Sequence, residues 1–252
     1  MKVGAATDIG LIRMMNQDSY YCSSGVEDPC LFIVADGMGG HNGGEIASRV
    51  SVDTIKDFIQ GNYQKPEYQK DRLLLIKDAM NKANSVIYGL SMEDPNLRGM
   101  GTTLTMTLIE EERLYIGHIG DSRMYLLRNG ECRKLTEDHS LVAQLIKNGS
   151  ISPEEGENHP QKNVITRALG IDTEAEIDLD TLMLQQGDTL LLCTDGLTNM
   201  LDLADIVGIC GLGDSPQSIS ELLVEEANKK GGRDNVTAIV VKVGCSELLV
   251  RF

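Results

Sequence analysis

The chain has 252 residues, of which 41% are hydrophobic and 24% are charged, and its formal net charge at pH 7 is −15. A chain of this length and composition can bury a full hydrophobic core, so we predict one domain over residues 1–252. Nucleic-acid-binding proteins present a basic face to the phosphate backbone, and the acidic balance of this chain therefore argues against nucleic acid as its partner.

The sequence also argues against a membrane protein. No apolar stretch reaches the roughly 18 to 20 residues that a membrane-spanning helix needs, and the N-terminus lacks the apolar segment of a signal peptide. The cysteines form no CxxC pair and mostly lie inside apolar runs, which favours reduced thiols in the cytoplasm over disulfides or zinc ligands. They are Cys22, Cys30, Cys132, Cys193, Cys210 and Cys245.

The first half of the chain combines strands with two long helices. Short extended segments over 2–6 and 20–22 precede the apolar run 31–35, which predicts a buried strand. Over 45–60 and 71–90, apolar residues recur every three or four positions, which predicts two helices that each have one apolar face.

From residue 101 the apolar residues alternate with polar ones, and this period of two predicts antiparallel strands. Asn129-Gly130 is typical of a hairpin turn. Further elements follow in order: a hairpin of strands over 176–184 and 189–194, a helix over 203–210, a helix that begins at Ser215-Pro216, and a strand over 236–243.

Residues 136–170 have an irregular and polar pattern that contains one helical piece over 140–148. A long, weakly patterned excursion between strands is often a lid or a binding loop. A plain surface excursion is the alternative.

Three predicted strands have an aspartate at one end. Asp36 follows the run 31–35 and precedes a cluster of glycines, Asp195 follows a second apolar run, and Asp234 lies just before the last strand. Carboxylates packed together repel one another, and a divalent cation removes that cost. The pattern therefore favours a metal site where these strand ends meet, although any one of these aspartates alone reads better as the solvated start of a turn.

Two further segments carry groups suited to such a site. The guanidinium of Arg13 presents a planar fork that matches a phosphate, and Asp18 could reach a metal through its water shell. A surface ion pair is the alternative for this segment. Asp121 follows Gly120 between two predicted strands, where a simple bulge or turn is the alternative.

Six short motifs occur in order along nearly the whole chain. They are Arg13-x-x-Asn16-Gln17-Asp18, Asp36-Gly37-Met38-Gly39-Gly40, Gly101-Thr102-Thr103, Gly120-Asp121-Ser122-Arg123, Thr194-Asp195-Gly196 and Gly232-Arg233-Asp234-Asn235. Together they resemble the type 2C (PPM) family of metal-dependent protein serine/threonine phosphatases, in its compact bacterial form. The resemblance implies an α+β fold, a four-layer αββα sandwich of two central antiparallel sheets flanked by helices. It also implies that residues 140–168 form a flap that shapes substrate access.

The resemblance gives each candidate residue a role. Two Mn²⁺ or Mg²⁺ ions would share a water, lower its pKa and direct it at phosphorus without a covalent phosphoenzyme. Arg13 would hold the phosphate and offset its charge, so we expect Arg13, Asp36 and Asp195 to be catalytic. The implied metal ligands are Asp36 as the bridge, the Gly37 carbonyl on one ion, Asp195 and Asp234 on the other, Asp18 through water, and Asp121 with Asp195 for a third, weaker metal.

One departure from the family leaves the general acid open. Met38 stands where eukaryotic relatives carry a histidine that has been proposed for this role, and methionine cannot donate a proton. His41, His139, His159 or a metal-bound water could serve instead. A surface histidine, or one satisfied in the core, is the commoner alternative for each.

The leading prediction is a hydrolase that dephosphorylates phosphoserine and phosphothreonine in bacterial cytoplasmic signalling and opposes a cognate serine/threonine kinase. A pseudophosphatase would bind phosphoproteins without turnover, but its expected mark, loss of a metal carboxylate, is absent from the sequence. A hydrolase of small phosphoesters or nucleotides is the third possibility, and the chain has no Walker-type loop. The acidic surface and the lack of a heptad seam favour a monomer.

Overall fold

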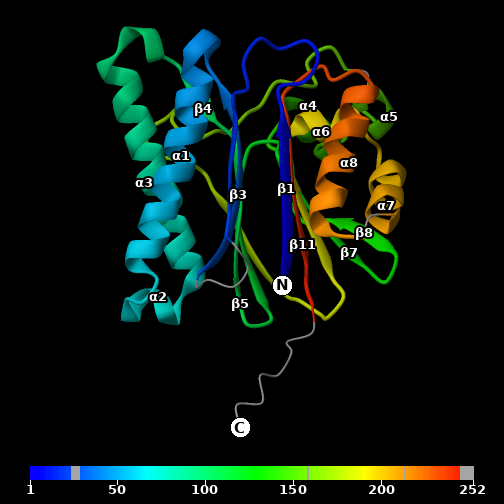
Figure 1. Ribbon diagram of the computed structural model, residues 1–252. Helices are drawn as coiled ribbons and strands as arrows, with labels where there is room; N and C mark the ends of the chain where they lie inside the picture. Colours follow the sequence, from blue (N-terminus) through cyan, green and yellow to red (C-terminus); the bar gives the residue numbers. More distant parts are fainter. Residues whose placement is uncertain (24–28, 158, 213, 245–252) are drawn as a thin grey trace.

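The computed structural model describes residues 1–23, 29–157, 159–212 and 214–244, which form four layers (Figure 1). Two antiparallel sheets pack face to face in the middle. Helices α1 (Gly40–Asn62) and α3 (Arg72–Glu93) cover one outer face, and α7 (Leu203–Leu212) and α8 (Pro216–Lys229) cover the other. The predicted αββα sandwich is therefore confirmed.

Each sheet is antiparallel throughout. The first has the order β1 (Lys2–Asp8), β11 (Val236–Lys242), β10 (Thr189–Cys193), β7 (Arg123–Arg128) and β8 (Glu131–Lys134). The second has the order β2 (Asp18–Cys22), β3 (Cys30–Met38), β5 (Leu104–Glu110), β6 (Arg113–Ile119) and β9 (Asp178–Met183), and β4 (Gly101–Thr102) pairs with the end of β3. The strands β1 and β2 are the sheet edges on one side of the sandwich.

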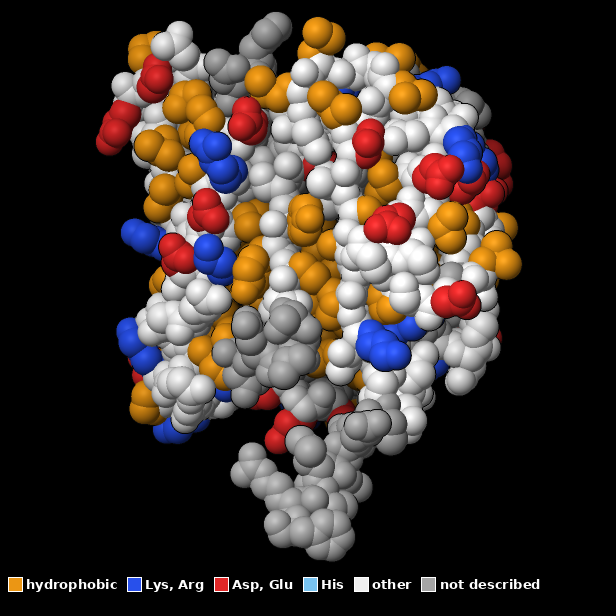
Figure 2. Space-filling view, viewed as in Figure 1, with side chains coloured by type: hydrophobic (Ala, Val, Ile, Leu, Met, Phe, Trp, Pro, Cys, Tyr) orange, Lys and Arg blue, Asp and Glu red, His pale blue; other side chains and the backbone are white. Residues whose placement is uncertain are grey.

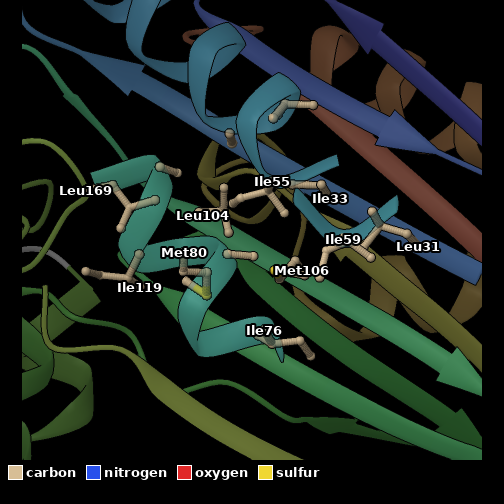
Figure 3. Packing of buried hydrophobic residues seen from close by; sticks show 14 of the residues in the cluster. Leu31, Ile33, Ile55, Ile59, Ile76, Met80, Leu104, Met106, Ile119 and Leu169 are labelled. Atoms are coloured by element: carbon tan, nitrogen blue, oxygen red, sulfur yellow. The ribbon is translucent and has the colours of Figure 1, made fainter. Parts of the chain in front are cut away.

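Three apolar layers hold the sandwich together. Along β3, Leu31 and Ile33 pack against the helices α1 and α3, as Figure 3 shows, whereas Phe32 and Val34 pack between the two sheets. A third layer lies between the first sheet and α8. The uninterrupted apolar run of β3 thus follows from burial on both of its faces.

The two long helices appear where their periodicity predicts them, with somewhat wider bounds. The carboxylate of Asp71 begins α3 by accepting the Leu74 N–H at 3.1 Å, and Ser215 begins α8 with a capping box. The shorter helices are α2 (Pro66–Lys70), the 3-10 turn η1 (Pro95–Leu97), α4 (Leu141–Lys147), α5 (Pro153–Glu157) and α6 (Asp195–Thr198).

The predicted hairpin of 176–184 with 189–194 is wrong. Strand β9 pairs with β6 in the second sheet, whereas β10 pairs with β7 and β11 in the first. At the crossing, the buried carboxylate of Asp188 accepts hydrogen bonds from Arg128 and from the Gln185 N–H, at 2.6 to 2.8 Å. The turn signal was correct, but the alternation of residues does not identify a strand's partner.

The edge strand β1 is covered at its middle by a side chain from α8. The amide of Gln217 donates to the Ala5 carbonyl at 3.0 Å and accepts the Ala5 N–H at 3.1 Å. Both edge-facing backbone groups of Ala5 are therefore satisfied within the chain.

Cysteine chemistry agrees with the prediction for the described residues. Cys22, Cys30, Cys132, Cys193 and Cys210 are reduced thiols, and Cys245 lies outside the described residues. Burial raises the pKa of Cys193 to about 12. In the described part of the chain, none of the helices is both long and apolar enough to cross a membrane.

Candidate metal centre

The predicted aspartates come together at one end of the sandwich. In the register of the second sheet, Asp18 lies directly opposite Asp36. In the first sheet, β10 and β11 are antiparallel, so Asp195, just after β10, and Asp234, just before β11, fall at the same end. The two sheets therefore bring four carboxylates to one place.

Asp18 joins the two sheets at this point. Its Oδ2 atom accepts hydrogen bonds from the hydroxyls of Thr194 at 2.8 Å and Thr237 at 2.7 Å. Asp18 is in the second sheet, whereas both threonines lie at the end of the first sheet. Its Oδ1 atom is buried and has no hydrogen-bond partner among the described residues. Such an oxygen is costly unless a further donor or a cation approaches it.

Asp195 has the same arrangement. Asn199 donates to Oδ2 at 2.9 Å, and Oδ1 is buried without a hydrogen-bond partner in the part of the chain that is described. The helix α6 begins at Asp195, so a short turn fixes this carboxylate directly after the buried strand β10.

The backbone of Asp36 is fixed by two neighbouring threonines. The Asp36 N–H donates to Thr103 Oγ1 at 3.0 Å, and the Asp36 carbonyl accepts from Thr102 Oγ1 and from the Thr103 N–H, both at 2.9 Å. These contacts explain the Gly101-Thr102-Thr103 motif, whose role the sequence left open.

Glycines allow α1 to begin against the end of β3. A Cβ atom on Gly37 would lie 2.0 Å from the Gly44 carbonyl oxygen, and one on Gly44 would lie 2.6 Å from the Gly37 oxygen. No side chain fits at either position. The glycine cluster after Asp36 therefore permits a close backbone approach beside the carboxylates.

The pKa values of these carboxylates are raised, because the groups are buried and their negative charges repel one another. Burial, and then the charges of Asp18 and Asp195, raise the pKa of Asp36 well above its usual value. Burial raises the pKa of Asp18 to about 7, although the hydroxyls of Thr237 and Thr194 oppose the shift. Burial and the charge of Asp195 raise the pKa of Asp121 to about 7. Together with the partnerless oxygens, these shifts indicate a site suited to divalent cations.

Arg13 is paired with one of the expected ligands. Its Nη2 atom lies 2.6 Å from Oδ2 of Asp234, and 51% of the Arg13 side chain is exposed. Across the described ranges, no three His, Cys, Asp or Glu side chains form a ready-made metal-binding group. The carboxylates lie close together, but Asp234 forms an ion pair with Arg13. Among the described residues, Asp234 does not form a complete set of metal ligands with the other carboxylates.

Asp121 lies between β6 and β7, in a turn that is held by His139. The Gly120 N–H donates to His139 Nδ1 at 3.1 Å, and the His139 N–H donates to the Gly120 carbonyl at 2.7 Å. The other ring nitrogen of His139 lies 3.1 Å from Asp178 Oδ2. His139 is therefore a buried histidine with both ring nitrogens engaged, as the commoner alternative for it predicts.

The remaining histidines do not identify a general acid. His159 accepts the Gln161 N–H at 3.1 Å, and the side chain of His41 lies outside what the structure describes. Sequence reasoning missed His118, which is buried beside His139. Burial, and then the charge of His139, lower the pKa of His118 to about 4. In the sequence, only the position of His118 in the alternation along β6 indicated that its side chain is buried.

Asn235 also has a role that the motif alone did not reveal. Its amide donates to the carbonyls of Ile9 and Met15, both at 2.9 Å, and accepts the Gln17 N–H at 2.8 Å. The residue after Asp234 therefore holds the loop that carries Arg13.

The base of the excursion after β8 is pinned close to the carboxylates. Thr102 and Leu169 exchange backbone hydrogen bonds at 3.0 and 2.9 Å, and Ser140 forms a bridge with Ile165. Since Thr102 also binds the Asp36 carbonyl, the excursion ends next to the site, and its start is held beside Asp121 by the hydrogen bond from the His139 backbone to Gly120. Its role as a flap stays a prediction.

The family model for protein phosphatase 2C matches residues 13–228. The chain belongs to this family. It is 38% identical over 236 residues to the serine/threonine phosphatase stp of Listeria welshimeri, with 94% of this chain and 93% of the relative covered. It is also 38% identical over 247 residues to the protein phosphatase PhpP of Streptococcus pneumoniae, with 96% and 98% covered.

Solved structures of this protein phosphatase 2C family share the fold. The serine/threonine phosphatase PstP of Mycobacterium tuberculosis superposes with a TM-score of 0.88 at 37% identity, with 97% of this chain and 99% of that chain covered. A PstP catalytic domain in complex with two manganese ions gives a TM-score of 0.85 at 36% identity, with 97% and 98% covered. The prediction of a protein serine/threonine phosphatase is confirmed.

Proposed function

We propose that this phosphatase removes phosphate from phosphoserine and phosphothreonine with two divalent cations held by Asp36, the Gly37 carbonyl, Asp195 and Asp234. The observation that carries this proposal is a pair of buried oxygens, on Asp18 and Asp195, that have no hydrogen-bond partner among the described residues and lie among carboxylates of raised pKa. The manganese ions of the related PstP structure support it. When bound, such cations supply an activated water and offset charge on the phosphate.

The residues of this chain divide the remaining work. Arg13 presents its fork to the phosphate oxygens and offsets their charge as the ester bond breaks. Asp18 is held through one oxygen by Thr194 and Thr237, and its second oxygen stays available to orient water at the site. Asp121 would add a third, weaker site for Mn²⁺ or Mg²⁺ together with Asp195.

The ion pair between Arg13 and Asp234 suggests how the site becomes competent. Asp234 cannot serve a cation fully while it accepts a hydrogen bond from Arg13 at 2.6 Å. Cation binding by Asp234 would therefore release Arg13 for the phosphate. We propose that residues 1–252 act as one catalytic domain, that 140–168 is its flap, and that a bacterial serine/threonine kinase supplies its phosphoprotein substrates.

The decisive experiment measures phosphate release from a phosphothreonine peptide by chelator-treated protein, before and after addition of Mn²⁺. We expect activity only with the metal. Asp36→Asn and Asp195→Asn should each lower kcat/KM by roughly a thousandfold, because metal stabilisation of the transition state contributes several kcal/mol. Asp57→Asn is the matched control, since that carboxylate is 74% exposed on α1.

Two outcomes would contradict the proposal. Wild-type protein that binds the phosphopeptide but stays inactive with Mn²⁺ and Mg²⁺ would be a binding module. Faster turnover of nucleotides than of phosphopeptides would indicate a small-molecule hydrolase. Mn²⁺ binding measured by calorimetry tests the ligand set independently of turnover.

A further inference from the structure

The loop between β1 and β2 exposes large apolar side chains on both sides of Arg13. The exposed fractions are 66% for Leu11, 67% for Ile12 and 96% for Met14. We refer to these three residues as the apolar shelf. Figure 2 shows hydrophobic side chains at the top of the molecule, where Figure 1 places this loop.

The apolar shelf is held in place by hydrogen bonds from several directions. The Leu11 N–H donates to the Gly232 carbonyl at 2.7 Å, and the Gly10 N–H donates to Asp8 Oδ1 at 2.8 Å. Asn235 binds the loop on both sides of the shelf, at the carbonyls of Ile9 and Met15. The exposure of these side chains is thus imposed by a fixed backbone.

Gly232 brings the shelf close to the carboxylates. A Cβ atom at Gly232 would lie 2.8 Å from Leu11 Cγ and 3.0 Å from the Leu11 nitrogen, and Gly232 has a φ of +48°. Only glycine fits there without displacing Leu11. The loop therefore packs directly on the segment that leads into Asp234.

Single exposed apolar residues are normal on protein surfaces, but a contiguous group next to a functional site marks a binding surface. Among the other exposed apolar side chains of the described residues, Ile9 is 37% exposed at the start of this loop, whereas Met92 and Leu212 lie outside it. The three residues of the apolar shelf fall within the four consecutive positions 11–14. The remaining residue is Arg13, the cation proposed to bind phosphate.

The charge of the loop also fits a phosphorylated partner. Residues 9–17 contain no acidic side chain, in a chain with 38 Asp and Glu residues. A phosphopeptide can therefore approach Arg13 over the shelf without meeting a carboxylate of this loop. In an extended peptide, successive residues advance only about 3.3 Å per position, so the residues that flank the phosphorylated one stay close to Arg13 when Arg13 holds the phosphate.

We propose that the apolar shelf binds apolar side chains that flank the phosphorylated residue, so that the enzyme prefers phosphothreonine or phosphoserine in apolar sequence. This inference rests on the proposed function, because it takes Arg13 as the phosphate ligand. The shelf then selects among phosphoproteins, whereas the cations and Arg13 read only the phosphate.

The test compares two phosphothreonine peptides, one flanked on both sides by leucine and the other by serine. With Mn²⁺, wild-type protein should show about a tenfold higher kcat/KM for the leucine-flanked peptide, as expected for apolar groups that are partly buried on binding. The double variant Ile12→Ser/Met14→Ser, which retains Arg13, should bring the ratio close to one.

Leu212→Ser is the matched control. Leu212 is 79% exposed and is the last residue of α7, close to the start of α8. The end of α8 lies beside the loop, and the 14 residues of this helix span about 20 Å. This variant should keep the wild-type ratio. Thermal unfolding of all three proteins checks that the fold is retained.

Three results would overturn the inference. Equal kcat/KM for both peptides in wild-type protein would overturn the role of the shelf and leave the proposed function standing. Turnover of neither peptide with Mn²⁺ would overturn the proposed function, and the shelf's role with it. A dimer that the double variant converts to a monomer, with an unchanged peptide ratio, would show that the shelf binds a second copy of this chain.

Discussion

The two ends of the second sheet both carry carboxylates, but only one end balances its own charge. Glu110, at the end of β5, receives two hydrogen bonds from the buried guanidinium of Arg72, at 2.6 and 3.1 Å, and one from the hydroxyl of Tyr63 at 2.8 Å. These partners lower its pKa. Asp36 lies at the opposite end of the neighbouring strand, and its pKa is raised.

The difference between Glu110 and Asp36 shows how the chain compensates the charge of a carboxylate that has only a structural role. The Glu110 site contains its own cation, and Arg72 is held further by the Tyr63 carbonyl and by the Tyr63 ring at 3.9 Å. The carboxylates around Asp36 have Arg13 as a nearby cation, and that side chain is half exposed. One end is complete within the chain, whereas the other, under the proposed function, takes its cations from solution.

Breaking the complete end should have the largest effect on stability. We expect Arg72→Ala to lower the free energy of unfolding by about 3 kcal/mol, because it leaves Glu110 half-buried without its cation. Urea denaturation measures this loss. Arg49→Ala, whose ion pair with Glu45 is exposed, is the control and should change stability by less than about 1 kcal/mol.

The incomplete end should gain stability from metal. Mn²⁺ at a hundred times its dissociation constant should add about 2.7 kcal/mol to the free energy of unfolding, or roughly 5 to 10 °C in Tm. Arg72→Ala should keep this gain, because its site is separate. An equal gain in Asp195→Asn would mean that the metal binds elsewhere.

The two ends of the sheet should also differ, by a smaller amount, in how their stability depends on pH. The pKa of Asp18 is about 7 in the folded protein and near 3.8 when unfolded, so the folded state holds the proton more tightly. Chelator-treated protein should therefore lose stability as pH rises from about 4 to about 7, and change little above that.

Asp18→Asn should reduce this slope in Tm against pH. The neutral His118, whose pKa is lowered to about 4, contributes a slope of opposite sign, but it is common to both proteins and cancels in the difference. Identical slopes for the variant and wild type would show that Asp18 is not a buried, proton-binding group.

Sequence reasoning identified the features that depend on local pattern. The helices α1 and α3 follow from their period, α8 also follows from its Ser215-Pro216 start, and the aspartates at strand ends follow from where apolar runs stop. The partner of β9 could not be predicted this way, because alternation describes a strand's faces and not its neighbours. Only the resemblance to a family indicated two stacked sheets before the structure was known.

The site shows the same limit. The hydrogen bonds from Thr194 and Thr237 to Asp18, and the ion pair of Arg13 with Asp234, join residues more than 170 positions apart. No pattern within a short window specifies such contacts. The motifs identified which residues meet. Only the packed sandwich shows that one oxygen of Asp18 is buried with no hydrogen-bond partner in the described part of the chain.

The contact between Gln217 and Ala5 affects how these molecules behave at high concentration. An exposed sheet edge invites a strand from another molecule, and repeated addition of this kind leads to aggregation. On β1, the amide of Gln217 already makes the two central hydrogen bonds that an incoming strand would need. A second molecule would first have to displace a side chain of α8, so this edge of the sheet is protected by the helix that covers it.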